Sequence, residues 1–279
     1  MNIPDAASSD TIAFIGGGNM ARSLIGGLIA RGTATDSIRV AEPVAELRDA
    51  LQRDFNVAVF ADASDAVAGA HTWLFAVKPQ VMCGVCESLA PVAKSAEPLI
   101  VSIAAGITAA QLERWLGSGA SVVRAMPNTP ALLGAGVTGL FANARVDADG
   151  RERARQLLSS AGEVVWIEDE AKMDAVTAVS GSGPAYVFLL AEAMEQAARA
   201  EGLPADAART LVLQTVLGAA RMLTEANEAP DELRHRVTST GGTTQAAIET
   251  FELNGFRELV ALAIRNATER GRQLSAAND

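Results

Sequence analysis

The stretch Ile12–Ala21 constrains the fold of this chain more than any other. Four apolar residues predict a short buried strand, the glycines Gly16–Gly18 predict a sharp turn, and apolar residues at helical spacing then predict a helix. Small residues at Gly16, Gly18 and Ala21 give the spacing G-x-G-x-x-A, which lets a backbone approach a pyrophosphate closely. The N–H groups that begin the helix would face that anion. A dinucleotide-binding turn is therefore predicted, with a plain tight turn as the alternative.

The rest of the first half alternates between short apolar runs and helical stretches. Runs that are apolar throughout are typical of buried parallel strands, and their alternation with helices predicts an α/β fold with a doubly wound, Rossmann-type parallel sheet. We expect further strands at 38–41, 57–60, 73–77, 98–103 and 121–124, edge strands at 137–141 and 163–167, and helices that include 43–54, 109–116 and 149–161.

Only helical patterns continue after about residue 168. We expect helices at 171–179, 184–201, 204–226, 230–237, 243–254 and 256–274. The chain is thus predicted to comprise a dinucleotide-binding Rossmann domain at 1–167 and an all-helical domain at 168–279, the latter for substrate binding and dimerisation.

One predicted helix has too little polar surface to be covered within its own domain. The stretch Leu211–Met222 carries a single charge, at Arg221, and is apolar or small on nearly every face. Such a helix must be buried all round, and a helical domain of about 110 residues can hardly enclose it. A second copy of the chain is therefore expected to cover it in a dimer.

Charge and hydropathy exclude several classes of protein. The 279 residues carry a net charge of −10 without a cluster of Lys or Arg, which argues against a nucleic-acid partner. No apolar run reaches the roughly 18 residues that a membrane span needs, so no membrane partner is expected. The stretch Met1–Asp10 lacks the basic and apolar regions of a secretory signal, which predicts a cytoplasmic protein.

Cysteines and histidines are too few for a metal site. Cys83 and Cys86 are the only cysteines and fall on a predicted helix, so helix-face or core residues are favoured over a redox pair. No second cysteine pair exists for zinc, and His71 and His235 are the only histidines. We therefore expect no metal.

Four loops leave the carboxyl ends of the predicted strands, where open α/β sheets bind their ligands. They are the stretches Gly16–Met20, Val77–Gln80, Ser102–Gly106 and Arg124–Pro130. Each loop could instead have a purely structural role. The prolines could simply end strands or begin helices, and the alanines could allow tight packing. Together the loops would form one rim, which favours a cofactor cleft.

Glu42 ends the second predicted strand, 24 residues after Gly18. An acid near this position often binds the diol of the adenosine ribose and favours NAD over NADP. The alternative is a charge that complements the start of the helix after Pro43. The sequence leaves these two interpretations open.

Two loops of the helical half combine glycines with hydroxyl side chains at the start of a helix, namely Ser180–Tyr186 and Ser239–Thr244. Their backbone N–H groups and hydroxyls suit a carboxylate, with helix capping by Ser or Thr as the alternative.

The positions of the histidines argue against a 2-hydroxy-acid dehydrogenase. Such an enzyme needs a histidine beside a carboxylate as its acid and base. Neither His71 nor His235 is well placed, whereas reduction of an imine mainly requires orientation of the substrate.

Six motifs follow one another along the chain: Ile15–Ala21, Ala76–Pro79, Ser102–Gly106, Arg124–Pro130, Gly181–Tyr186 and Gly241–Thr244. In this order they resemble the motifs of pyrroline-5-carboxylate reductases, over nearly the whole chain. The resemblance implies reduction of 1-pyrroline-5-carboxylate to L-proline by NADPH or NADH, the last step of proline biosynthesis. It also implies a dimer through the helical domain, in many members a pentamer of dimers.

The resemblance also implies the roles of individual residues. Thr244 matches the position that contacts the nitrogen of the substrate ring, and is the expected catalytic residue. The expected substrate-binding residues are Ser239, Gly242, Thr243, Thr244, Met126 and Pro127. The expected cofactor-binding residues are Gly16, Gly17, Gly18, Asn19, Met20, Ala21, Glu42, Ala76, Val77, Lys78, Pro79, Ala104, Ala105 and Gly106.

Two positions depart from the family pattern. Thr240 replaces the usual proline before Gly241, which implies a slightly less rigid loop. Glu42 replaces the Ser, Asn or Arg of NADPH-preferring members, which leaves the coenzyme preference open.

Two other classes of protein stay as alternatives. One is a β-hydroxyacid dehydrogenase-like enzyme, a class whose members resemble one another in a catalytic lysine; here Lys172 lacks the G-x-x-x-K-x-x-x-N run around it. The other is a non-catalytic NAD(P) sensor.

Overall fold

The computed structural model describes residues 10–117 and 119–278. Residues 1–9, on which most of the expectation of no secretory signal rests, lie outside this range. Two compact units make up the chain: Met1–Ser182 together with Ala267–Asp279, and Gly183–Asn266. The division by function at 167/168 stays a prediction, because compactness alone does not report which residues bind substrate.

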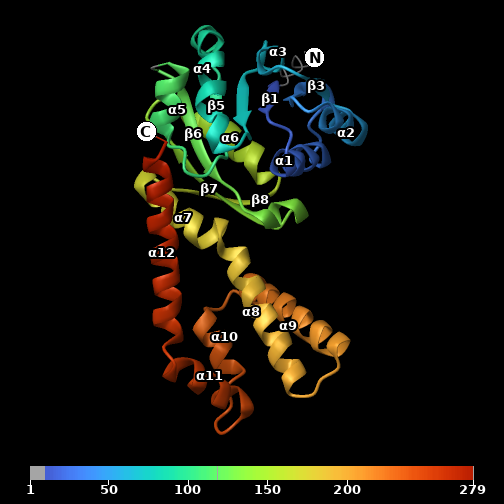
Figure 1. The fold of residues 1–279 in the computed structure, drawn as a ribbon, viewed down its shortest axis with the longest axis vertical. Coiled ribbons are helices and arrows are strands. Elements are labelled where there is room, and N and C mark those ends of the chain that lie inside the picture. The colour runs from blue at the N-terminus through green and yellow to red at the C-terminus, as the bar shows by residue number, and fades with distance from the viewer. Residues whose placement is uncertain (1–9, 118, 279) are drawn as a thin grey trace, which may run out of the picture. The chain divides into compact units, whose positions relative to one another are not determined.

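The first unit contains the sheet drawn in Figure 1. It has eight strands in the order β3-β2-β1-β4-β5-β6-β7-β8. All neighbouring strands are parallel except β6 and β7, so the predicted doubly wound sheet is confirmed. The strands are β1 Ile12–Ile15, β2 Ile38–Ala41, β3 Ala58–Phe60, β4 Thr72–Phe75, β5 Leu99–Ser102, β6 Ser121–Met126, β7 Gly136–Ala142 and β8 Gly162–Trp166.

Helices cover both faces of this sheet, since the residues of β1 contribute to two separate clusters of buried side chains. Phe14 belongs to a cluster that includes Leu24 and Leu157, whereas Ala13 belongs to one that includes Met82. The helical elements of this half are α1 Asn19–Ala30, η1 Thr35–Ser37, α2 Ala45–Phe55, α3 Ala63–Val67, α4 Pro79–Ala96, α5 Ala109–Leu116, η2 Thr129–Leu133 and α6 Ala148–Ser159.

Local sequence explains where two helices of this half begin. Pro79 occupies the first turn of α4, where its missing N–H costs nothing. Thr108 caps α5 in a capping box with Gln111. Both cysteines lie on α4 as predicted and are free; Cys86 is buried, and this burial raises the pKa of its thiol to about 12.

The helix expected at 171–179 is instead three short turns of different pitch, so that expectation was wrong in detail. They are η3 Glu170–Lys172, α7 Met173–Val176 and the π-helical turn η4 Thr177–Gly181. The hydroxyls of Thr177 and Ser180 donate to carbonyls four residues back, at 3.0 and 2.9 Å, which disturbs a regular helix. Such π turns occur frequently at functional sites.

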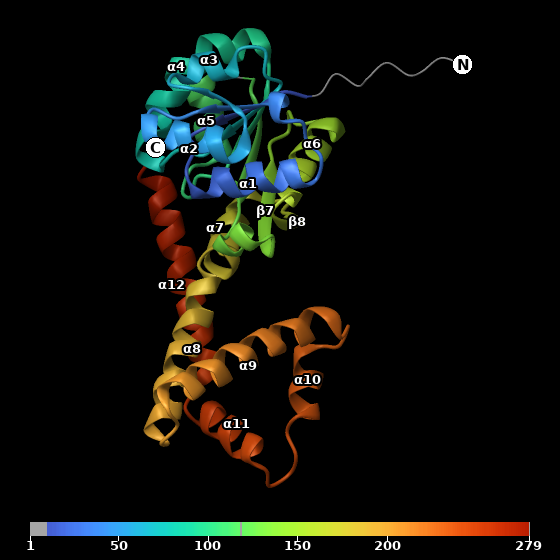
Figure 2. The same cartoon turned by 90° about the vertical axis from the view of Figure 1, so that its right-hand side faces the viewer.

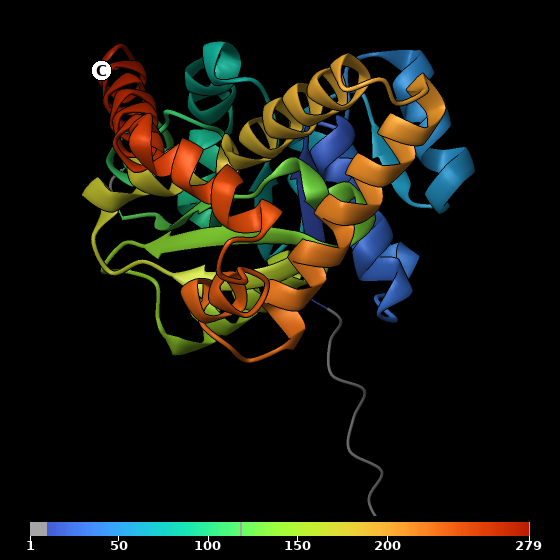
Figure 3. The same cartoon turned by 90° about the horizontal axis from the view of Figure 1, so that it is seen from below.

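The second unit consists of helices (Figures 2 and 3). They are α8 Gly183–Ala200, α9 Ala205–Glu225, α10 Pro230–Arg236, α11 Thr243–Leu253 and the first part of α12 Phe256–Ala276, whose last residues belong to the first unit. Within the single chain α9 exposes large apolar side chains; Leu211 and Leu217 are 56% and 54% exposed. Within the described residues, no helix is both long and apolar enough to cross a membrane.

Candidate active site

The glycine turn after β1 is shaped by its contacts. Gly16 has a φ of +102°, and a Cβ on it would lie 2.7 Å from the carbonyl oxygen of Ala76. A Cβ on Gly17 would lie 2.5 Å from Cδ1 of Leu51. By contrast, a Cβ on Gly18 would meet no atom within 4 Å in the described part of the chain. The first two glycines therefore serve packing, and the third borders open space.

This geometry fits the pyrophosphate of a dinucleotide. Gly18 is the N-cap of α1, and none of the described side chains caps this helix. The N–H groups of its first turn have no acceptor within the helix and are therefore suited to an anion. Asn19 is exposed, Met20 is half-buried, and Ala21 is buried where α1 packs onto the sheet.

The Glu42 carboxylate joins the end of β2 to this turn. Its Oε2 accepts a hydrogen bond from the N–H of Gly17 at 3.0 Å, and its Oε1 accepts one from the N–H of Val44 at 3.1 Å. The residue is only 7% exposed. Glu42 thus lies both at the predicted cofactor turn and just before α2. The interpretation as a ribose-binding acid and the interpretation as a charge at the start of a helix each describe part of its position.

Arg48 is a neighbour of Glu42 that the sequence alone does not single out. Its Nη1 donates to the carbonyl oxygens of Glu42 and Pro43, at 2.7 and 2.8 Å. An arginine close to this acid is one way in which such folds accommodate the 2′-phosphate of NADP. The only signal in the sequence is its position on the first turns of the helix after Glu42.

Two further predicted loops lie next to the glycine turn because β1, β4 and β5 are neighbours in the sheet. The N–H of Ala76 donates to Ile15, and that of Ile103 donates to Phe75, at 2.8 and 3.1 Å. Val77 is half-buried and Lys78 is exposed where they lead into Pro79. Ala104 and Gly106 are buried, Ala105 is exposed, and Gly106 has a φ of +72°.

The fourth loop follows β6 and contacts the π-helical turn η4. A Cβ on Gly181 would lie 2.6 Å from Cε of Met126, so this methionine packs directly on the turn. Pro127 is buried next to Asn128. The Asn128 side chain donates from its Nδ2 to the carbonyl oxygen of Ser180 at 3.2 Å, and its Oδ1 accepts from the N–H of Val137 at 3.0 Å. Its role in this structure is thus to fix the loop.

The loop Ser239–Thr244 belongs to the second unit. Gly241 has a φ of +72°, and its N–H donates to the Gln245 side chain at 2.6 Å. Gly242 is the N-cap of α11, which no side chain in the ranges described caps. The capping role considered for the Ser and Thr side chains is therefore absent here. Thr243 is exposed and Thr244 is half-buried.

The other candidate residues belong to other segments of the chain than these loops. His71 immediately precedes β4, at the opposite end of the strands, with its Nδ1 3.8 Å from an Asp10 carboxylate oxygen. His235 is exposed on α10, and Lys172 is exposed at the end of η3. Across residues 10–117 and 119–278, no three His, Cys, Asp or Glu side chains gather as a metal site.

The sheet and its glycine turn define a Rossmann-type protein of the dinucleotide-binding class. Residues 11–106 match the family model described as NADP oxidoreductase, coenzyme F420-dependent, and residues 170–274 match the model described as pyrroline-5-carboxylate reductase dimerisation. The chain belongs to the pyrroline-5-carboxylate reductase family, as its resemblance predicts.

Relatives cover the chain almost completely. A pyrroline-5-carboxylate reductase of Pseudomonas aeruginosa is 53% identical over 268 residues, which is 96% of this chain and 98% of the relative. The solved reductase of Coxiella burnetii has a TM-score of 0.93 at 41% identity, over 96% of this chain and 99% of that one. The Plasmodium falciparum reductase, solved with NADP bound, has a TM-score of 0.84 at 26% identity, over 97% and 100% of the two chains.

These comparisons confirm several predictions. The chain is an oxidoreductase of this family, so the classes of β-hydroxyacid dehydrogenase and non-catalytic sensor are set aside. A nicotinamide coenzyme, NADPH or NADH, is confirmed as the coenzyme type. The helical region carries the family's dimerisation domain, which supports self-association. The roles of individual site residues stay predictions.

Proposed function

We propose that this chain reduces 1-pyrroline-5-carboxylate to L-proline at the expense of NADPH or NADH. The observation that carries the proposal is family membership across 96% of the chain. The open glycine turn and the uncapped start of α11 support it, because the reaction needs one site for a pyrophosphate and one for a small carboxylate.

Cofactor binding is assigned to the three neighbouring loops of the first unit. The glycine turn with Asn19, Met20 and Ala21 would hold the pyrophosphate, while Ala76–Pro79 and Ala104–Gly106 would line the nicotinamide. Support comes from the open space at Gly18 and from the order of β1, β4 and β5 in the sheet. When bound, the coenzyme supplies a hydride to the carbon of the substrate's C=N bond.

Substrate binding is assigned mainly to the start of α11. The N–H of Gly242 already donates to the carbonyl of Ser239, at 3.0 Å. Thr243 and Thr244 occupy the first two positions of the helix, whose N–H groups have no intrahelical acceptor, and suit the substrate carboxylate. The hydroxyl of Thr244 is proposed to contact the ring nitrogen. Ser239 and Gly242 belong to the same loop and are proposed to contribute to substrate binding. Met126 and Pro127, in the first unit, are proposed as substrate-binding residues from the family resemblance alone.

The proton balance requires little of the protein. Hydride adds to carbon, the C=N double bond becomes a single bond, and the nitrogen ends with one proton more than the neutral imine carried. An imine nitrogen can arrive protonated, so a hydroxyl that orients it suffices and no histidine is required. His71 and His235 belong to none of the loops that are assigned here to the coenzyme and the substrate.

The proposal is tested by adding pyrroline-5-carboxylate to the purified protein with NADPH or with NADH. We expect coenzyme oxidation that depends on the imine, with formation of an equal amount of proline. A reaction without the imine is the control. Failure to oxidise either coenzyme would overturn the proposed function.

Dimerisation through the second unit is proposed to produce the active form. The exposed apolar residues of α9, Leu211, Leu213 and Leu217, support a partner surface there. Further assembly into a pentamer of dimers and location in the cytoplasm stay proposals; sedimentation at several concentrations and cell fractionation test them.

A further inference from the structure

The end of α12 packs against the loop that follows β5, within the first unit. The Nδ2 of Asn278 donates to the carbonyl oxygen of Gly106 at 3.1 Å and to that of Leu274 at 2.8 Å. A Cβ on Gly106 would lie only 3.3 Å from Cβ of Leu274. Together with its φ of +72°, this proximity explains why a glycine stands at this position.

A second contact joins α12 to the start of α5. The Nε2 of Gln111 donates to the carbonyl oxygen of Ser275 at 3.0 Å, while its Oε1 accepts from the N–H of Thr108 at 2.8 Å. The same glutamine is part of the capping box of α5. The loop Ser102–Thr108 is therefore held by α12 and the residues that follow it, in its middle at Gly106 and, through Gln111, at its end.

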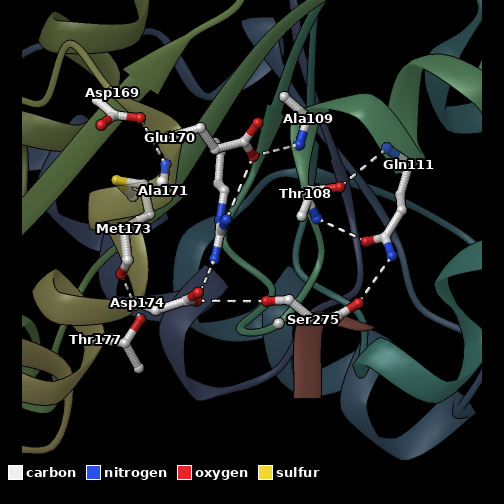
Figure 4. A network of polar contacts seen from close by, with 12 residues as sticks. Thr108, Ala109, Gln111, Asp169, Glu170, Ala171, Met173, Asp174, Thr177 and Ser275 are labelled. Carbon is white, nitrogen blue, oxygen red and sulfur yellow. Dashed lines mark hydrogen bonds and ion pairs between the residues drawn. The ribbon is translucent and has the colours of Figure 1, made fainter. Parts of the chain in front are cut away.

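A buried arginine connects these contacts to β6. The Arg124 guanidinium contacts carboxylate oxygens of Glu170 and Asp174, at 3.3 and 3.2 Å, and the residue is 4% exposed. Glu170 also accepts from the N–H of Ala109 at 2.7 Å, and Asp174 accepts from the Ser275 hydroxyl at 3.4 Å (Figure 4). Four segments distant in sequence thus meet at one cluster.

The approach of α12 to this cluster is close. A Cβ on Gly271 would lie 3.1 Å from Cβ of Asp174. Removing one partner of a buried ion pair leaves the other charge uncompensated, so substitutions at Arg124 or Asp174 would disturb the whole unit. Asn278, at the periphery, is the residue whose loss tests the contact with the loop alone.

We propose that residues 274–278 are a positioning element for the coenzyme, which holds the loop Ser102–Thr108 in the shape that receives the nicotinamide. This inference rests on the proposed function, which assigns Ala104–Gly106 to that group. Ala104 and Ala105 directly precede the carbonyl that Asn278 binds, so a shift of Gly106 displaces them. Asn278 acts through the loop and is not a catalytic residue.

The test uses the full-length protein with Asn278→Ala, and a chain that ends at Leu274 as a second variant. Coenzyme affinity is measured by direct titration with NADPH and NADH, without the imine. Loss of one hydrogen bond predicts binding about 3- to 10-fold weaker for Asn278→Ala. The KM for coenzyme should rise accordingly, while kcat at saturating coenzyme and the KM for the imine stay within about twofold.

Asn254→Ala is the matched control. The Nδ2 of Asn254 donates to the carbonyl four residues back, Thr250, at 2.8 Å, as Asn278 does to Leu274. It lies in the second unit, outside the loop contact, so its coenzyme affinity should match that of the wild type. Thermal melting of each variant separates a loss of affinity from a loss of folding.

Three results would overturn the inference. Unchanged coenzyme affinity in both C-terminal variants overturns it alone and leaves the proposed function standing. If Asn278→Ala and Asn254→Ala weakened coenzyme binding equally, the loss would be a general effect of substitutions at helix ends and not of the contact with the loop. A wild type that binds neither NADPH nor NADH would overturn the proposed function, and the inference with it.

Discussion

The N–H of Gly17 donates to the carboxylate of Glu42 at 3.0 Å, so the glycine turn and the end of β2 form one structural unit. A charge fixed at this place lies where an adenosine ribose binds in folds of this type. The chain therefore offers a direct test of how one carboxylate sets coenzyme preference.

We expect Glu42→Gln and Glu42→Ser to lower the KM for NADPH more than the KM for NADH. The ratio of the KM for NADPH to the KM for NADH should fall by about fivefold. The reason is the loss of repulsion between a carboxylate and the 2′-phosphate. Glu42→Gln removes the charge and keeps an oxygen for only one of the two N–H groups, of Gly17 or Val44, because they donate to different carboxylate oxygens. Steady-state kinetics with both coenzymes measure the effect. An equal change for the two coenzymes would show that Glu42 serves only the start of α2.

Two glycines of the turn, Gly16 and Gly18, should respond differently to substitution by alanine. Gly16→Ala is expected to destabilise the fold by about 1–3 kcal/mol, because its Cβ meets the Ala76 carbonyl at a positive φ. Gly18→Ala should leave the melting temperature nearly unchanged but weaken coenzyme binding, since its Cβ enters the open space. Melting curves and coenzyme titrations on both variants test this; a Gly18→Ala protein with wild-type affinity contradicts it.

Strands and helices of this chain are predictable from local patterns. The run 38–41 coincides with β2 and the run 109–116 with α5, because apolar alternation and caps mark their ends. The strand expected at 73–77 ends at Phe75, since Ala76 and Val77 already lead into Lys78, the N-cap of α4. The type of these elements was thus clear from the sequence, whereas the end of β4 shifted where a predicted cofactor loop begins.

Contacts between distant segments are not predictable in the same way. Asn278 and Gly106 are 172 positions apart, and Arg124 and Asp174 are 50 apart. No local pattern says which carbonyl an amide binds, or which carboxylate an arginine meets. For the same reason the sequence did not indicate that Gly17 rather than a ligand occupies one oxygen of Glu42, although it placed both residues near the cofactor turn.

Disruption of the apolar surface of α9 should dissociate the dimer. Leu217→Glu puts a charge on a helix whose apolar side chains are exposed in the single chain. We expect monomer at micromolar concentration and loss of activity. Val165→Glu is the control, because Val165 is 50% exposed on β8 in the first unit. Analytical ultracentrifugation distinguishes the two; an active, stable wild-type monomer would contradict obligate dimerisation.

The thiols of α4 should resist alkylation in the native protein. Burial raises the pKa of Cys86 to about 12 and also raises the pKa of Cys83, so both stay protonated at neutral pH. Because only the thiolate reacts, iodoacetamide should label them slowly until the protein unfolds. Mass spectrometry of native and denatured samples checks the labelling.

The stability of the fold should also depend on the ionisation of Cys86. The thiol of unfolded Cys86 ionises at a lower pH than that of folded Cys86, so the contribution of the buried thiol to stability is lost as the pH rises from about 8.5 towards 12.

The last prediction separates the two threonines at the start of α11. Thr244→Ala should reduce kcat/KM by about 10- to 100-fold, since a hydrogen bond to a charged group contributes about 1.5–3 kcal/mol. The loss should appear in kcat more than in KM, because the contact strengthens as charge on the ring nitrogen changes. Thr243→Ala should cost less, since its backbone N–H survives the substitution.

The structure adds one reason to expect this order, because Thr243 is exposed in the single chain whereas Thr244 is half-buried. No side chain among the described residues caps the helix that both threonines begin, which leaves either hydroxyl available to the substrate. Thr244→Ser, which keeps the hydroxyl, should restore most of the activity, whereas Thr244→Val, which keeps the shape without the hydroxyl, should not. Near-normal kinetics for Thr244→Ala beside a crippled Thr243→Ala would show that Thr243 is the residue that orients the imine.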